Sequence, residues 1–399
     1  MRQLKFIIIL LLLLMVTTPA LAQQTASTSG QGTGSPVALP ELLQRANEAY
    51  AAGDDKQAII DYSLFILLNP TFSQAYYNRA LSYEATGDLN QAIQDLGRAL
   101  NYNVPSPEYA ASILLVRAQM YLNQNNLQAA LTDLNASIDA DPQAIDSISL
   151  RAQLLSFLER YPAALSDYDR LIELEPDEPV HYVDRGFTHA QLGNVDDALG
   201  DYSRAIDLDP DDARPYVSRA IFYSSLEAFN EALTDINNAI EINPDIGEFY
   251  LLRGSIKTSV DQPAEAADDY FHWLTLNRTQ EFQAQTTLTD NQIFTVEMGP
   301  GWIYNIPFNA SEGQTVSIAA RAASEQTPVD PLLVILGVNG SPVIADDDSG
   351  GNLAAFIRDY TIPEDGEYTI VVGHAAGGAP QGNIDVRVDL GLAALATED

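Results

Sequence analysis

The stretch "YVDRGFTHAQLGNVDDALGDY", residues 182–202, decides the fold. Before "LGN", one set of residues has the i, i+3, i+4, i+7 spacing of a helix face: Tyr182, Arg185, Gly186 and His189. After "LGN", a second set has the same spacing: Ala198, Asp201, Tyr202 and Ala205. Each face carries one charge, on Arg185 or on Asp201. The stretch therefore predicts two helices joined by a short turn, and it leaves open whether the two charges bind a ligand or belong to the frame.

The same pattern recurs seven times along the chain. An alanine opens each second helix, at Ala58, Ala92, Ala130, Ala164, Ala198, Ala232 and Ala266, with spacings of 34 residues and a single spacing of 38. A small residue stands twelve positions earlier, at Ala46, Ala80, Ala118, Ala152, Gly186, Ala220 and Gly254. Small residues let two helix backbones approach closely. The sequence therefore predicts seven stacked antiparallel helical hairpins over residues 39–280.

These residues resemble the tetratricopeptide repeat family, in which an aromatic residue or leucine, then Gly or Ala, Gly, Ala and Pro recur over 34 residues. A proline ends the second helix in five of the copies, at Pro70, Pro142, Pro176, Pro210 and Pro244. The resemblance implies a right-handed helical solenoid, whose first helices line a concave groove that binds proteins. It implies no catalytic chemistry.

The two charges of the opening stretch are part of the repeat. Every copy has an arginine and, sixteen residues later, an aspartate, and the pairs are Arg45–Asp61, Arg79–Asp95, Arg117–Asp133, Arg151–Asp167, Arg185–Asp201, Arg219–Asp235 and Arg253–Asp269. A ligand is not periodic, so a ligand site would vary between copies. The sequence therefore predicts a structural ladder of ion pairs, formed within a repeat or across to the next one.

Candidate ligand-binding residues follow from the repeat register. In an array of this type, positions three before and one after the small residue face the concave side, which gives Tyr77, Leu81, Leu115, Gln119, Val183, Phe187, Val217, Ile221 and Leu251. This floor has almost no Lys or Arg, which favours an apolar or mixed peptide surface over an acidic tail. The alternative is that some of these side chains pack between neighbouring repeats.

Around Thr286 the apolar period changes from that of a helix to that of a strand. Short strands such as "FTVEM", "WIYNIPF", "LLVILG" and "YTIVVG" alternate with Gly, Pro and Asp turns, which predicts an antiparallel β-sandwich over residues 281–390 and a tail over 391–399. The segments "VDPLLVIL" (329–336), "GSPVIADDDS" (340–349) and "PEDGEYTIVV" (363–372) resemble the bacterial pre-peptidase C-terminal (PPC) domain. That resemblance implies a jelly-roll-like accessory module of exported proteins.

The last repeat cannot leave an apolar flank open to water. Trp273 occupies the position of Ala99, Ala205 and Ala239 in other copies. We therefore expect Trp273, Tyr270 and Phe271 to pack against the β domain or against its lead-in, "TQEFQAQ".

The N-terminus predicts export. A basic start, the apolar run "FIIILLLLLMV" and "Ala-Leu-Ala" at 20–22 indicate a signal peptide over residues 1–22, followed by a Gly- and Ser-rich linker over 23–38. Removing the signal peptide takes the net charge from −35 to −37, because Arg2 and Lys5 are lost. Such a surface repels nucleic acid and anionic lipid, and we expect no membrane insertion of the mature chain.

Candidate catalytic and metal sites are few. The chain has no cysteine, and its four histidines fall in no recognised catalytic motif. In the turn "DDDSGG", Asp346, Asp347 and Asp348 are weak calcium candidates, and the alternative is a solvated turn. The sequence therefore predicts a non-catalytic scaffold, periplasmic or extracellular, that binds protein or peptide partners in its groove. The alternative is a polysaccharide- or matrix-binding protein that acts through the sandwich.

Overall fold

The computed structural model describes residues 39–102, 104–323, 329–347, 354–375 and 382–391. The predicted signal peptide, linker and most of the predicted tail lie outside these residues. The described residues contain fourteen helices followed by nine strands, so the predicted order of α then β is confirmed. The chain divides into two compact units, with described residues up to Leu208 in the first and those from Asp209 onward in the second. Repeats six and seven therefore belong to the same unit as the sandwich.

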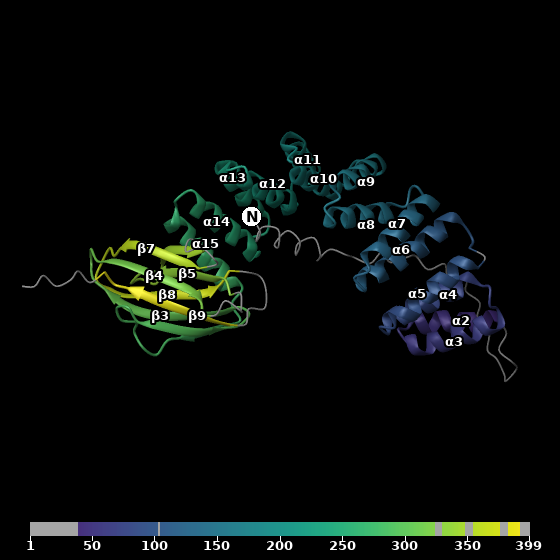
Figure 1. Ribbon diagram of the computed structural model, residues 1–399, viewed down its shortest axis with the longest axis horizontal. Coiled ribbons are helices and arrows are strands. Elements are labelled where there is room, and N and C mark those ends of the chain that lie inside the picture. Colours follow the sequence, from purple (N-terminus) through teal and green to yellow (C-terminus); the bar gives the residue numbers. More distant parts are fainter. Residues whose placement is uncertain (1–38, 103, 324–328, 348–353, 376–381, 392–399) are drawn as a thin grey trace, which may run out of the picture. The chain divides into compact units, whose positions relative to one another are not determined.

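Each repeat is a hairpin of two antiparallel helices (Figure 1). The first unit contains α2 (Leu39–Ala51), α3 (Asp55–Leu68), α4 (Ser73–Ala85), α5 (Leu89–Asn101), α6 (Pro107–Asn123), α7 (Leu127–Ala140), α8 (Ile145–Phe157), α9 (Tyr161–Leu174), α10 (Pro179–Leu192) and α11 (Val195–Leu208). The second unit contains α12 (Ala213–Ser225), α13 (Phe229–Ile242), α14 (Gly247–Ser259) and α15 (Pro263–Leu276). None of the described helices combines the length and the apolar character that crossing a bilayer requires.

The small residue of the first helix packs against a large side chain of the second helix, as Gly186 and Gly254 illustrate. A Cβ added to Gly186 would stand 3.0 Å from the Tyr202 ring, and one added to Gly254 would stand 2.9 Å from the Tyr270 ring. Both tyrosines are at most 1% exposed. The small residues at this position therefore allow the close helix contact that the repeat pattern predicts.

The turn inside each hairpin contains one residue in the left-handed conformation. This residue always stands five positions before the conserved alanine and has φ between 56° and 85°, and the seven are Gly53, Gly87, Asn125, Glu159, Gly193, Glu227 and Asp261. Glycine adopts this conformation without strain, whereas a residue with a Cβ does not. The four turns without glycine are therefore strained.

Replacing Glu227 by glycine is expected to raise the free energy of unfolding. Relief of left-handed strain contributes about 1–2 kcal/mol, and the greater freedom of glycine in the unfolded chain removes about 0.5–1 kcal/mol of that gain. Glu227→Ala keeps the Cβ and serves as the control. Chemical denaturation followed by circular dichroism measures both variants. Equal effects of the two substitutions would contradict this account.

The nine strands form two sheets. The strands are β1 (Gln280–Gln283), β2 (Ile293–Met298), β3 (Trp302–Ala310), β4 (Thr315–Ala322), β5 (Pro331–Leu336), β6 (Pro342–Asp347), β7 (Ala355–Thr361), β8 (Gly366–His374) and β9 (Gly382–Asp389). One sheet has the order β1-β3-β8-β5-β6 and the other has the order β2-β9-β4-β7. From β2 onward this is jelly-roll connectivity, as the sequence resemblance implies.

One pair of strands departs from the predicted antiparallel arrangement. The lead-in that follows α15 forms β1, which pairs in parallel with β3, from Gln280 opposite Trp302 to Gln283 opposite Asn305. The other strand pairs are antiparallel. Because β1 begins only four residues after α15 ends, the chain passes directly from the last repeat into the edge of the sheet.

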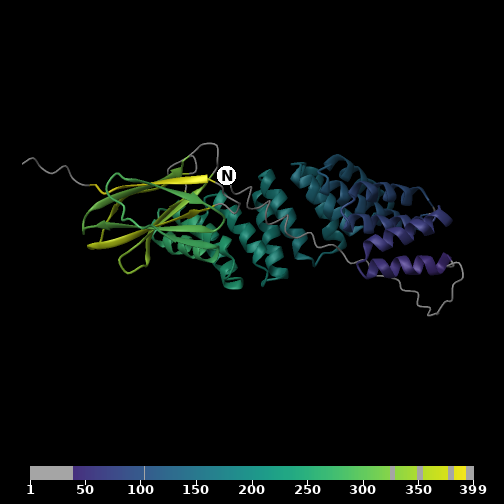
Figure 2. The same cartoon turned by 90° about the horizontal axis from the view of Figure 1, so that it is seen from below.

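The sheet that contains β5 is buried on both faces. Leu333 and Ile335 belong to the core between the two sheets, whereas Leu332 and Val334 belong to a second cluster with α15. Figures 1 and 2 both show the last helices beside the strands of this unit. The sandwich therefore covers the end of the repeat array.

Helix α15 supplies the predicted aromatic residues to this contact. Tyr270 and Trp273 are buried in the cluster with the strands, and Phe271 packs against its edge, so the expected docking is confirmed. The closest approach comes from Leu274, which the sequence did not indicate. Its Cδ2 lies 2.2 Å from where a Cβ on Gly373 of β8 would stand, so only glycine fits there.

Candidate functional site

The ion-pair ladder forms within each repeat. In every copy the arginine Nε and Nη2 donate hydrogen bonds of 2.5–3.0 Å to the two carboxylate oxygens of the aspartate sixteen residues later. The aspartate side chains are at most 8% exposed. This bidentate geometry holds both helices of the hairpin in register.

Several arginines also reach the preceding repeat. The Nη1 groups of Arg79, Arg151, Arg185 and Arg253 donate to the side chain sixteen residues earlier, which is Ser63, Asn135, Asp169 and Asn237 respectively. Each of these arginines therefore bonds the second helix of its own repeat and that of the repeat before. The Arg–Asp pair itself thus forms within a repeat, and the contact with the preceding repeat uses a different partner residue.

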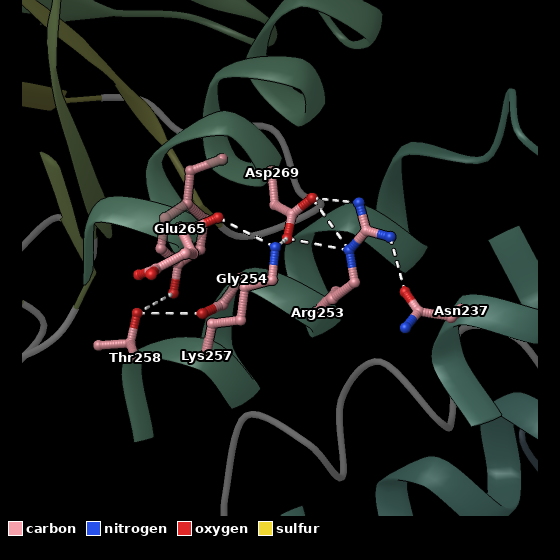
Figure 3. A network of polar contacts seen from close by, with 8 residues as sticks. Asn237, Arg253, Gly254, Lys257, Thr258, Glu265 and Asp269 are labelled. Atoms are coloured by element: carbon pink, nitrogen blue, oxygen red, sulfur yellow. Dashed lines mark hydrogen bonds and ion pairs between the residues drawn. The ribbon is translucent and has the colours of Figure 1, made fainter. Parts of the chain in front are cut away.

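The seventh repeat adds a second cation, Lys257, to its Arg–Asp pair (Figure 3). Lys257 Nζ donates to Asp269 Oδ2 at 2.7 Å and to the Glu265 carbonyl at 3.0 Å, while Arg253 bonds Asp269 from the other side. Lys257 replaces the tyrosine found at this register in repeats two, three and six. The terminal repeat therefore has more ionic contacts on its aspartate than the pair alone provides.

Hydrogen bonding within the ladder favours the ionised forms of Arg117 and Asp61. The hydrogen bond to Asp133 raises the pKa of Arg117, and the hydrogen bond from Arg45 lowers the pKa of Asp61. A general acid or base must exchange a proton near the working pH, which such groups do not do. The ladder is therefore suited to a structural role.

The candidate groove residues separate into two groups by burial. Tyr77, Leu115 and Val217, which stand three positions before the small residue, are 7–8% exposed and belong to the hydrophobic clusters of the repeats. Tyr77 also packs on Tyr109 of the next repeat, with ring centroids 5.7 Å apart. These three side chains pack mainly against protein, which was the alternative for this set.

The remaining candidates keep part of their surface exposed. In the first unit these are Leu81 on α4, Gln119 on α6, and Val183 and Phe187 on α10. In the second unit, Ile221 packs against the cluster of repeats six and seven, and Leu251 packs against the cluster of α15 and the sheet. Their role in binding a ligand stays a prediction.

A hollow opens on the candidate face between the third and fourth repeats. It has a volume of about 230 Å³, and its lining includes Leu115 and Ser112 of α6 and Ile145 at the start of α8. Glu108, Asp141 and Asp146 also line it. The hollow thus combines an apolar base with an acidic border.

The calcium candidate Asp346 and the histidine His181 have hydrogen-bond partners within the protein. Asp346 Oδ2 accepts a 2.7 Å hydrogen bond from the Phe356 backbone N–H, and Asp348 lies outside the described residues. His181 Nε2 lies 2.9 Å from Glu175 Oε2, and burial lowers the pKa of His374. The part of the chain that the structure describes contains no group of three or more His, Asp or Glu residues that could hold a metal ion.

Two segments of the chain, residues 77–145 and 158–214, match family models of the tetratricopeptide repeat. These two segments are similar to tetratricopeptide repeats. Sperm-associated antigen 1 from Mus musculus is 32% identical over 98 residues, which are 25% of this chain and 10% of that protein. The chain therefore spans about a tenth of the length of this curated relative.

Solved tetratricopeptide repeat structures are similar to part of the chain at low sequence identity. The C-terminal part of a repeat protein from Cytophaga hutchinsonii has a TM-score of 0.50 at 13% identity, covering 59% of this chain and 95% of its own. One from Parabacteroides merdae has a TM-score of 0.47 at 21% identity, covering 60% and 94%. YrrB, described as having an unusual peptide-binding site, has a TM-score of 0.42 at 22% identity, covering 49% and 97%.

Proposed function

We propose that the chain is an exported, non-catalytic scaffold that binds partner proteins through the first helices of its tetratricopeptide repeats. Proteins with these repeats generally mediate protein–protein interactions. The observation that carries the proposal is the row of partly exposed residues Leu81, Gln119 and Phe187 at one register, beside a frame of bidentate ion pairs. A rigid frame with a variable exposed row suits recognition.

The chemistry of the hollow defines the partner further. Ile145 offers an apolar contact, whereas Glu108 and Asp146 add negative charge to the same lining. A peptide with an apolar side chain flanked by basic residues would complement this surface. The charge of −35 on the whole chain would also accelerate the approach of a basic partner.

Export and the nature of the sandwich belong to the same proposal. The sequence of residues 1–22 supports a signal peptide, and the absence of cysteine fits a chain that is stable without disulfides. The jelly-roll order of β2 to β9 supports a PPC-like accessory module. In this proposal the sandwich closes the repeat array, and the groove binds the partner.

The alternative function, binding of an anionic polysaccharide or matrix, has one observation in its favour. The basic residues of 281–399 are Arg321, Arg358 and Arg387, and all three are exposed on the outer face of the β2-β9-β4-β7 sheet. Arg358 stacks over the ring of Phe356 at 4.7 Å. An aromatic ring with flanking arginines on a sheet face can bind an acidic sugar.

Phe187→Ser is expected to reduce partner capture at least tenfold, because a buried aromatic contact is often a dominant part of an interface. The measurement is affinity capture by the full mature chain from the secretome of the exporting organism, repeated with Leu81→Ser. Leu192→Ser is the matched control, since Leu192 ends the same helix and is 39% exposed. Circular dichroism verifies folding.

Capture that survives both groove substitutions would refute the groove as the binding site. If capture then fails with Arg321→Gln combined with Arg358→Gln, the sandwich face is the binding site and the alternative function holds. Added salt provides a second readout, because binding to the acidic border of the hollow should weaken as ionic strength rises.

A further inference from the structure

Helix α3 exposes a stripe of large aliphatic side chains. Ile60 is 53% exposed, Leu64 is 45%, Leu67 is 77% and Leu68 is 59%, and we call these four residues the α3 stripe. Their spacing of four, three and one places them on one side of the helix. The opposite side of α3, with Tyr62 and Phe65, is buried in the repeat core. The helix is therefore apolar on both sides, although only one side is covered by the repeat.

The first three residues of the stripe have no aliphatic counterpart in other repeats, whereas Leu68 corresponds to Leu174, Leu208, Ile242 and Leu276. At the register of Ile60, Leu64 and Leu67, repeats two to seven have small, polar or charged residues. In chain order these are Gln94, Arg98 and Asn101; Thr132, Ala136 and Asp139; Ser166, Arg170 and Glu173; Gly200, Arg204 and Asp207; Thr234, Asn238 and Glu241; and Asp268, His272 and Thr275. None of these is a large aliphatic residue. Exposed apolar patches of this kind mark contact surfaces in soluble proteins.

The charge around the stripe favours a second copy of the same chain. Two copies with a charge of −35 each repel one another over most of their surfaces. The stripe has no acidic residue, whereas the same register contains Asp139, Glu173, Asp207 and Glu241 in other repeats. Lys56, one of only three lysines in the chain, is exposed one turn before the stripe. Repulsion between copies is therefore reduced here.

We propose that the α3 stripe is a homodimer interface, in which two α3 helices pack antiparallel about a twofold axis near Leu64. This pairing places Leu64 against the partner's Leu64, and Ile60 against the partner's Leu67 and the partner's Leu68. It also places Lys56 beside the C-terminal end of the partner's α3, where free carbonyl groups carry partial negative charge. The contact is thus complementary in both shape and charge, and it does not depend on which ligand the groove binds.

The size of the stripe predicts a reversible dimer. A stable interface buries about 800 Å² per partner, and four partly exposed side chains fall short of that. The dimer should therefore dissociate on dilution. It would carry two grooves, so a partner with two binding segments would bind with an effective concentration set by their spacing.

The first test uses substitutions that other repeats already contain. Leu64→Arg copies Arg98, Arg170 and Arg204, and Ile60→Ser with Leu67→Glu copies Ser166 and Glu173, so the hairpin should tolerate them. Sedimentation equilibrium of the full mature chain should give a mass that rises twofold with concentration. Both variants should remain at the mass of one chain, with unchanged circular dichroism. A parent chain that stays monomeric at every concentration, or variants that still dimerise, would overturn the proposal.

The second test identifies the occupant. Because the chain has no cysteine, Leu64→Cys introduces a single thiol near the proposed twofold axis. Mild oxidation should link this variant into covalent dimers, whereas Phe157→Cys, at a position that is 60% exposed on α8, should remain mostly unlinked. Equal linking of the two variants would overturn the proposal. Dimerisation only after residues 23–38 are removed would show that this segment covers the stripe, and it would overturn the proposal for the mature chain.

Discussion

Arg117→Ala is expected to lower the free energy of unfolding of the repeats by about 3–5 kcal/mol, because it leaves the buried Asp133 without its charge partner. Asp133 is 5% exposed, and Arg117 supplies both of its ion-pair hydrogen bonds at 2.6 and 2.7 Å. Asp133→Ala should have an effect of similar size. Urea denaturation followed by circular dichroism at 222 nm gives the shift in midpoint.

The decisive comparison is a double substitution. Arg117→Met with Asp133→Leu replaces the pair by apolar side chains of similar length, and such replacements of buried pairs are often neutral or stabilising. The double variant should therefore be more stable than either single variant. Losses that simply add would mean that the two residues act independently, and the ladder would then not be the source of their stabilisation.

Leu274→Ala is expected to lower the stability of the second unit by about 2–5 kcal/mol, because it opens a cavity between α15 and the sheet. Leu274 is 3% exposed and lies against the bare backbone of Gly373. Gly373→Ala should also destabilise, by about 1–3 kcal/mol, since the added methyl group would overlap the leucine. Thermal melting followed by Trp fluorescence detects both effects, because Trp273 belongs to this cluster.

The two substitutions should compensate each other. In the Leu274→Ala background, the methyl group of Gly373→Ala enters space that the leucine has vacated, so its effect should shrink or change sign. Gly200→Ala is the control, since nothing lies within 4 Å of its added Cβ, and it should stabilise α11 by about 0.5–1 kcal/mol. If Gly373→Ala destabilises both backgrounds equally, the contact with Leu274 is not what requires a glycine at this position.

Periodic features could be predicted from the sequence because each copy confirms the others. The Arg185–Asp201 spacing recurs without exception, and the structure places each pair within a repeat. The same register contained two further signals. It aligned Glu159 and Glu227 with the turn glycines Gly53, Gly87 and Gly193, and it set Ile60 and Leu64 apart from their polar counterparts.

Features that occur once were harder to predict. The polar segment "QEFQ" has no strand pattern, and β1 forms because the chain leaves α15 beside the edge strand β3. The continuous apolar run "LLVIL" does carry a signal, since a strand with one face in water would alternate. This run indicates that both faces of β5 are buried, but it does not indicate which element covers each face. The contact between Leu274 and Gly373 depends on tertiary packing and has no local signature.

The covering of β5 by α15 determines where the array can change length. Leu332 and Val334 require the seventh repeat, so that repeat cannot be deleted without exposing an apolar sheet face to solvent. Earlier repeats bond mainly to their neighbours, through arginines such as Arg151, which reaches Asp167 and Asn135. Whole 34-residue modules can therefore be inserted or lost upstream while the same terminal assembly is kept.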